Sequence, residues 1–287
     1  MTRRPLVERI PDELTVWAFS DAHGMTDAVV EALRRARIVD ASGHWKATRT
    51  ALVCLGDTID RGPDSAGVID LLRRLGAEAE GTGDGSTVVT LMGNHEQLLL
   101  RGLDGDADWW DTWIGNHGGV TLESFGVKSP GGPGALRMDR AAPRLVEAAP
   151  WLHEWLDGLP DAARWRDVLL VHAGLIPGKS IAGWPRHDPW ENHLWVREEW
   201  FDEWKPAGLE HPTFRRYRAV GIDRVVFGHS VHPSITAHHG GTCLAIDTNA
   251  CEAYPPPYPA ALSLVRIPPD PGPFDLAQLK KVVVRTR

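Results

Sequence analysis

Five apolar runs in this sequence each end at a side chain that can bind a metal ion. The runs begin near Thr15, Thr50, Ser86, Arg166 and Asp223. The side chains that follow them are Asp21 with His23, Asp57, Asn94, His172 and His229. A single Asp or His after a strand is usually a turn residue or a helix cap. Five such endings in one chain favour a shared site.

The order of the segments predicts an α/β fold. Amphipathic stretches follow the first two runs, one beginning near Thr26 as a cap and one at residues 65–75, and residues 96–103 form a third helical stretch. Strands that alternate with helices are typical of a sheet between helical layers. Because ligands bind at the carboxyl ends of strands in open α/β sheets, we expect the five endings to converge.

The chain is predicted to be a single domain covering residues 1–287. Its 43% hydrophobic content is sufficient for one large core. Residues from about 104 to 165 break the alternation with tryptophans, a Gly-rich turn (SPGGPG) and a predicted helix at 144–156. We interpret this segment as a helical, Trp-rich insertion.

Charge and cysteine content exclude several classes of protein. A net charge of −7 argues against a general nucleic-acid-binding protein, which usually carries a basic excess. No uncharged apolar run approaches the roughly 20 residues of a membrane helix, and the amino end does not resemble a signal peptide. Cys54, Cys243 and Cys251 are too few and too scattered for a disulfide framework or a thiolate zinc site. A cytoplasmic protein without membrane or nucleic-acid partners is expected.

The donor types in the five endings indicate the kind of metal. Carboxylate, imidazole and amide donors without thiolates suit Mn²⁺, Fe or Zn²⁺. One central carboxylate can bridge two metals about 4 Å apart, which can then hold a shared hydroxide and neutralise a phosphoryl group. Because phosphate monoesters hydrolyse very slowly without a catalyst, this arrangement points to phosphoryl chemistry.

Five motifs carry a family resemblance. They are S-D-A-H-G from Ser20, G-D-T-I-D-R-G from Gly56, G-N-H-E from Gly93, H-A-G-L from His172 and G-H-S from Gly228. In this order they resemble the signature of the calcineurin-like metallophosphoesterases, and more closely the phosphoprotein phosphatase branch with its bacterial and phage members. The resemblance covers most of the chain and implies a four-layer αββα sandwich.

The resemblance also implies a role for each matching position. Metal 1 would be bound by Asp21, His23 and Asp57. Metal 2 would be bound by Asp57 as the bridge and by Asn94, His172 and His229. The family would use two divalent ions here, with Mn²⁺ favoured over Fe or Zn²⁺.

The remaining roles concern the acid and the phosphate. His95 would protonate the leaving group, and Asp60 would hold its imidazolium in place. Arg61 would bind the phosphate, together with Arg197 of the W-V-R-E motif. Glu96 is interpreted as a first-turn residue that complements the helix dipole.

The sequence departs from the family pattern at three positions. Ser20 replaces a Gly, Met92 stands where many protein phosphatases have Arg, and Asn249 replaces the Gly of I-D-T-G-A. The loss of the arginine weakens the assignment of substrate rather than of reaction. The spacing G-H-S-V-H also differs from the G-H-x-H of many nucleotide phosphodiesterases, so we do not expect His232 to be a ligand.

These features predict a phosphatase that acts on a phosphorylated protein, as phosphoserine or phosphothreonine, or on a small phosphoester. The first alternative is a symmetrical diadenosine tetraphosphatase. Its candidate contacts are the basic residues Arg215, Arg216 and Arg218 and the tryptophans Trp184, Trp190, Trp195 and Trp200. The second alternative is a catalytically silent metal-binding interaction module, which need not retain His95, Asp60 and Arg61 together.

Overall fold

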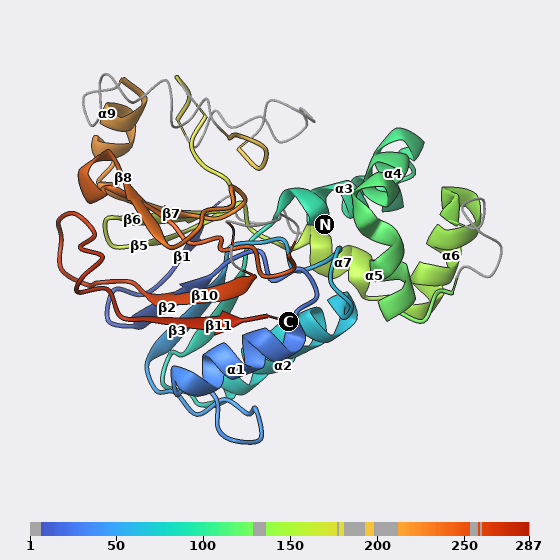
Figure 1. Cartoon of the computed structure of the whole chain (residues 1–287), viewed down its shortest axis with the longest axis horizontal. Helices are drawn as coiled ribbons and strands as arrows, with labels where there is room; N and C mark the ends of the chain where they lie inside the picture. The colour runs from blue at the N-terminus through green and yellow to red at the C-terminus, as the bar shows by residue number, and fades with distance from the viewer. Residues whose placement is uncertain are drawn as a thin grey trace.

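Two β-sheets packed face to face form the centre of the molecule (Figure 1). The computed structural model describes residues 7–128, 136–176, 178–180, 193–197, 212–252, 258 and 260–286. One hydrophobic cluster lies between the sheets, a second joins one sheet to α1 and α2, and a third joins the other sheet to α9. The predicted α/β fold with four-layer αββα order is therefore confirmed.

The first sheet has the strand order β11-β10-β2-β3-β4. Its strands are β2 (Thr15–Phe19), β3 (Thr50–Cys54), β4 (Thr87–Thr90), β10 (Ala261–Arg266) and β11 (Lys281–Arg285). The β2, β3 and β4 strands run parallel, so their carboxyl ends meet at one edge. Side chains alternate along β3, where Val53 packs between the sheets and Leu52 packs toward the helices. Those helices are α1 (Thr26–Arg35) and α2 (Ser65–Gly81).

The second sheet has the strand order β1-β5-β6-β7-β9-β8. Its strands are β1 (Val7–Arg9), β5 (Ala162–Trp165), β6 (Val168–Val171), β7 (Arg224–Phe227), β8 (Thr236–His238) and β9 (Cys243–Ala245). The α9 helix (Pro212–Arg218) packs Phe214 and Tyr217 against its outer face. The β6, β7 and β9 strands are parallel, so residues that follow them also share an edge.

A group of helices flanks the sheets on one side (Figure 1). It contains α3 (Asn94–Leu103), α4 (Ala107–Trp113), the π-helical turn η1 (Ile114–Gly118), α5 (Gly119–Ser124), α6 (Met138–Ala148) and α7 (Leu152–Asp157). Trp110 and Trp113 are completely buried in the cluster that these helices share. A short 3-10 turn, η5 (His239–Gly241), follows β8.

Two local predictions about helices are wrong. The helix expected at 144–156 is divided into α6 and α7. Pro150 explains the break, since proline lacks an N–H and disfavours helical backbone at the residue before it. The cap of α1 is Met25 rather than Thr26, whose hydroxyl donates to the carbonyl of Asp64 at 3.1 Å.

Some predicted features lie outside the described residues. They are the SPGGPG turn, most of the PPPYP loop, and Trp184, Trp190 and Trp200. Among the helices of the described ranges, none is long and apolar enough to cross a membrane.

Candidate active site

The residues at the ends of the strands gather at one edge of the two sheets. Asp21 and His23 follow β2, Asp57 follows β3 and His229 follows β7. All four have positive φ, between 42° and 63°, a region that L residues other than Asn and Asp seldom enter. Such strain is retained where the surrounding structure enforces it, often at functional sites.

Two glycines allow the strand ends to approach each other this closely. A Cβ at Gly228 would overlap Ser20 Oγ and the Asp21 carboxylate. A Cβ at Gly93 would overlap Asp57 Oδ1. The motifs G-H-S and G-N-H-E therefore need glycine at these positions, because any side chain would collide with the loops that carry Asp21 and Asp57.

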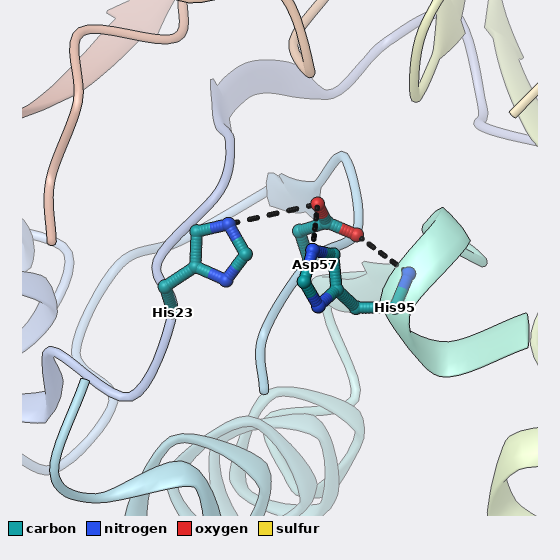
Figure 2. A group of neighbouring side chains, drawn as sticks. All are labelled: His23, Asp57 and His95. Carbon is teal, nitrogen blue, oxygen red and sulfur yellow. Dashed lines mark hydrogen bonds and ion pairs between the residues drawn. The ribbon is translucent and has the colours of Figure 1, made fainter. Parts of the chain in front are cut away.

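Asp57 lies at the centre of the site, with imidazoles on both sides. Its Oδ2 lies 3.6 Å from His23 Nε2 and 3.9 Å from His95 Nε2, as Figure 2 shows. Its Oδ1 lies 3.5 Å from His172 Nε2 and accepts the backbone N–H of His95 at 3.1 Å. Each oxygen therefore lies beside a different histidine ligand candidate, which would suit a carboxylate shared between two metals.

His23 and His172 present lone pairs rather than protons to Asp57. His23 Nδ1 bonds to the carbonyl of Ile59 at 2.7 Å, and His172 Nδ1 bonds to the carbonyl of Leu55 at 2.9 Å. A neutral imidazole has one N–H, so both Nε2 atoms are left as acceptors. Carbonyl partners of this kind fix the tautomer of histidines that bind metals.

In the second group of candidate ligands, the lone pair of His172 faces an amide oxygen. His172 Nε2 lies 2.9 Å from Asn94 Oδ1. The His229 ring lies 5.0 Å from that of His172, and its buried Nε2 has no hydrogen-bond partner among the residues that the structure describes. Asp57, His172 and His229 could together hold a metal ion, as could His23, Asp57 and His95. Acceptors that face one another without a proton between them fit a cation.

Burial separates the charge states of the histidines. It lowers the pKa of His172 and, with the charge of His95, lowers that of His23 to about 3. Burial and the nearby His172 imidazole hold the pKa of His229 well below its usual value. Burial also opposes the charged form of His95, but Asp57 and Asp60 outweigh it and raise the pKa of His95. The three ligand candidates are therefore neutral, whereas His95 favours the imidazolium.

His95 and Asp60 form a buried pair, named here the acid pair. His95 Nδ1 lies 2.6 Å from Asp60 Oδ2, and neither side chain is more than 1% exposed. Burial raises the pKa of Asp60, while hydrogen bonds from His95, Thr121 and Trp113 act in the opposite direction. Because Nδ1 is engaged, His95 Nε2 is the nitrogen that faces the metal-ligand candidates.

Asp21 and Asp247 bring further negative charge to the site. Asp21 Oδ2 accepts the backbone N–H of His229 at 2.9 Å and also the hydroxyl of Ser20. Burial and the charges of Asp247 and Asp57 raise the pKa of Asp21 well above its usual value. Burial likewise raises the pKa of Asp247 to about 6. A bound cation would relieve this repulsion.

Two arginines lie beside the site and supply positive charge. The charge of Arg61 partly offsets the raised pKa of Asp21 and adds to burial in lowering that of His23, and the charge of Arg197 adds to burial in lowering the pKa of His172 and His229. Arg197 Nη1 lies 3.5 Å from the carbonyl of His229. Both predicted phosphate-binding residues are therefore close to the proposed ligands, with partly exposed side chains.

Three features of the site were not predicted from the sequence. Asp247 follows β9 and ends a sixth apolar run, CLAI. The rule that identified the other five candidates would therefore have found it. Glu96 binds the backbone of the loop after β3, beyond its predicted role at the start of a helix. Trp113 and Thr121 contact Asp60, and no local pattern marks them.

Curated relatives of this chain include proteins named as protein phosphatases and as symmetrical tetraphosphatases. It is 35% identical over 216 residues to serine/threonine-protein phosphatase 1 of Salmonella typhimurium, covering 75% of this chain and 78% of that protein. It is 34% identical over 85 residues to Shewanella-like protein phosphatase 2 of Arabidopsis thaliana, covering 30% of this chain and 21% of the relative. It is 28% identical over 168 residues to a symmetrical bis(5'-nucleosyl)-tetraphosphatase of an Acidovorax species, covering 57% of this chain and 45% of that enzyme. The chain thus spans less than half the length of the last two.

Solved structures share the fold. A cold-active protein-tyrosine phosphatase of a psychrophilic Shewanella species matches with a TM-score of 0.59 and 18% identity, covering 92% of this chain and 80% of that one. A putative diadenosine tetraphosphatase matches with a TM-score of 0.54 and 18% identity, covering 99% of both chains. The family model described as calcineurin-like phosphoesterase matches residues 14–233. The chain therefore belongs to the calcineurin-like phosphoesterases, hydrolases that use a divalent metal centre.

Proposed function

We propose that this chain is a two-metal phosphatase that hydrolyses phosphate monoesters, with phosphoserine and phosphothreonine residues of proteins as substrates. The observation that carries the proposal is the geometry around Asp57. Its two oxygens lie 3.6 Å from His23 Nε2 and 3.5 Å from His172 Nε2, whereas His95 is bound through Nδ1 to Asp60 at 2.6 Å. Neutral histidines lie beside this carboxylate, while His95 favours the charged form. Environments that push the pKa values of neighbouring groups apart commonly mark distinct catalytic roles.

The metal ligands proposed here are those expected from the motifs. Asp21, His23 and Asp57 would bind one ion. Asp57, Asn94, His172 and His229 would bind the other. Two divalent cations, when bound, would supply positive charge to the phosphoryl oxygens and lower the pKa of an attacking water. The nitrogen and oxygen donors favour Mn²⁺, with Fe or Zn²⁺ as alternatives.

His95 is better suited to the role of general acid than to that of a metal ligand. The group formed by His23, Asp57 and His95 has spacings that a metal could use. However, a ligand must be neutral, and the pKa of His95 is raised rather than lowered. We therefore assign the proton on His95 Nε2 to the oxygen of the leaving group, with Asp60 holding the other ring nitrogen. Arg61 and Arg197 would bind the phosphoryl oxygens through their planar guanidinium groups.

The substrate class is supported by the relatives. The Salmonella protein, which this chain covers over most of its length, is named as a serine/threonine-protein phosphatase. Symmetrical tetraphosphatases are the alternative, because relatives with that name match over about half of this chain. A cytoplasmic location and the single-domain organisation with a helical insertion remain predictions from the sequence.

Hydrolysis of p-nitrophenyl phosphate tests the proposal most directly. The chain should be inactive after thorough chelation and regain activity when Mn²⁺ is added back. Activity that survives chelation would contradict the metal mechanism. Absence of hydrolysis with Mn²⁺, Fe²⁺ and Zn²⁺ alike would instead support the silent metal-binding module.

A further inference from the structure

The helices that follow α3 reach the carboxylate of Asp60. Trp113, at the end of α4, has its Nε1 3.0 Å from Asp60 Oδ1 and 3.0 Å from Oδ2. Thr121, on α5, has its Oγ1 2.6 Å from Asp60 Oδ1. Both side chains are completely buried. Figure 1 shows α4 and α5 beside α3, the helix that carries His95.

The protons in this contact can be assigned from the chemistry of the groups. An indole N–H can only donate, so Trp113 gives its proton to the carboxylate. The Thr121 oxygen accepts the backbone N–H of Asp60 at 2.9 Å and lies 2.9 Å from Ser65 Oγ. Its single proton is therefore directed to Asp60 Oδ1, the nearest acceptor. Asp60 receives two donors from these helices in addition to His95.

Both donors restrain the same carboxylate that His95 contacts: Thr121 binds Oδ1, and Trp113 lies between Oδ1 and Oδ2. Asp60 has a φ of 71°, so its backbone is held in the left-handed region. Thr121 bonds to both the backbone N–H and the side chain of this residue. Without these donors nothing would offset as much of the cost of burying the charged carboxylate, and the side chain could rotate. His95 would then lose the partner that directs its Nε2 toward the leaving group.

We propose that Trp113 and Thr121 are positioning residues for the acid pair, and that α4 and α5 thereby serve catalysis rather than packing alone. This inference rests on the proposed function, because it presupposes that His95 is the acid. It assigns a chemical role to two residues of the Trp-rich segment.

Trp113→Phe is the decisive variant, and the chain provides a matched control. Phe keeps an aromatic ring in the cluster but removes the N–H. Trp110 lies in the same helix, is equally buried and contacts the Trp113 ring, but its Nε1 donates to the carbonyl of Leu136 at 2.8 Å. Trp110→Phe therefore causes the same loss of volume and removes one indole hydrogen bond, but it removes no donor to Asp60.

Turnover should be measured on a phosphoserine peptide and on p-nitrophenyl phosphate, whose leaving group needs little protonation. Trp113→Phe should lower turnover on the peptide about 10- to 100-fold, the range for one hydrogen bond to a charged group. The loss on the aryl ester should be much smaller, and Trp110→Phe should lower neither selectively. Thr121→Val should behave as Trp113→Phe does, while Thr121→Ser should retain activity because it keeps the hydroxyl.

The His95→Asn background separates this inference from the assignment of the acid. If His95 is the acid and Trp113 acts through it, Trp113→Phe should cause no further loss in that background. Equal losses from Trp113→Phe and Trp110→Phe, or additive losses with His95→Asn, would overturn the positioning role alone. Equal losses from His95→Asn on both substrates would overturn the acid assignment, and this inference with it.

Discussion

Glu96 Oε2 accepts the backbone N–H of Asp57 at 2.8 Å, so the first turn of α3 holds the loop that carries the proposed bridging ligand. The same carboxylate accepts the N–H groups of Thr58 at 2.7 Å and of Gly93 at 3.0 Å. Glu96→Gln would place an amide –NH₂ against these donors. We expect a loss of about 1–3 kcal/mol in unfolding free energy and weaker metal binding, measured by urea unfolding and elemental analysis.

The exposed Glu147 provides the control for this substitution. Glu147→Gln also removes one negative charge, but from the surface of α6, and should leave stability and metal content unchanged. If both variants retain wild-type stability and metals, Glu96 does not hold the Asp57 loop.

The sequence allowed the fold and the positions of the candidate ligands to be predicted because both follow from local patterns. Apolar runs gave β2, β3, β4, β6 and β7, and the side chain after each run lies at a strand end. Parallel pairing then requires neighbouring ends to meet at one edge. The positions of Asp57 and His229 at strand ends could therefore be predicted without knowing any contact between distant residues.

The remaining features depend on contacts between distant parts of the chain. Trp113 and Asp60 are 53 residues apart, and Thr121 and Asp60 are 61 apart. Nothing near these residues in the sequence distinguishes a tryptophan that donates to a carboxylate from one that only packs. His232 illustrates the same difficulty: it lies in a loop and is half-buried, with its Nε2 3.1 Å from His238 Nε2, a contact that the neighbouring sequence does not indicate.

The bridging position predicts how metal content should change in variants. Asp57→Asn removes one negative charge from both proposed sites, so both ions should be lost, together with activity. His23→Ala should weaken one site and leave the other largely filled, because His23 Nε2 lies beside Asp57 Oδ2, whereas His172 lies beside Oδ1. Elemental analysis of the purified variants provides the test. Equal metal content in Asp57→Asn and the wild type would contradict the bridge.

If His95 is the general acid, the loss of turnover caused by His95→Asn should depend strongly on the leaving group of the substrate. Metal content should be retained, because His95 is not a proposed ligand. Turnover on alkyl phosphates should fall by about 10²- to 10⁴-fold, the usual contribution of a positioned general acid. A series of aryl phosphates with progressively better leaving groups should show a steadily smaller loss. A loss that is constant across the series would assign His95 a different role.

Glu78 predicts a pH dependence of stability that is independent of metals. Burial opposes its charged form, but the backbone N–H of Trp45 and the side chains of His44 and Arg74 outweigh it and lower the pKa of Glu78 to about 2. The unfolded chain, with a value near 4.5, therefore binds more protons in this range. The stabilising contribution is present above pH 4.5 and is lost as the pH falls toward 2.

Urea unfolding of the wild type and of Glu78→Gln at several pH values tests this. The difference in unfolding free energy between them should shrink as the pH falls. The variant should be less stable than the wild type by about 1 kcal/mol at pH 7, a modest value because the side chain is partly exposed to solvent. The two stability curves should converge as the pH approaches 2. A difference that is the same at every pH would mean that the charge of Glu78 is not responsible.

The substrate class is predicted from the charges beside the site. A diadenosine polyphosphate carries more negative charge than a monoester, and a dedicated site should offer correspondingly more cations. The basic residues considered for this purpose already have partners in the protein, since Arg218 pairs with Asp223 at 3.0 Å and Arg216 donates to the carbonyl of Gly178 at 2.6 Å. With a net charge of −7, the chain as a whole would also repel a polyanion.

We therefore expect higher kcat/KM for phosphoserine and phosphothreonine peptides than for diadenosine tetraphosphate, both assayed with Mn²⁺. Arg216→Ala should leave the ratio unchanged, as should Arg144→Ala on the exposed surface of α6. A tenfold or greater preference for the dinucleotide, with ADP as the sole product and with Arg216→Ala alone abolishing it, would establish the tetraphosphatase alternative instead.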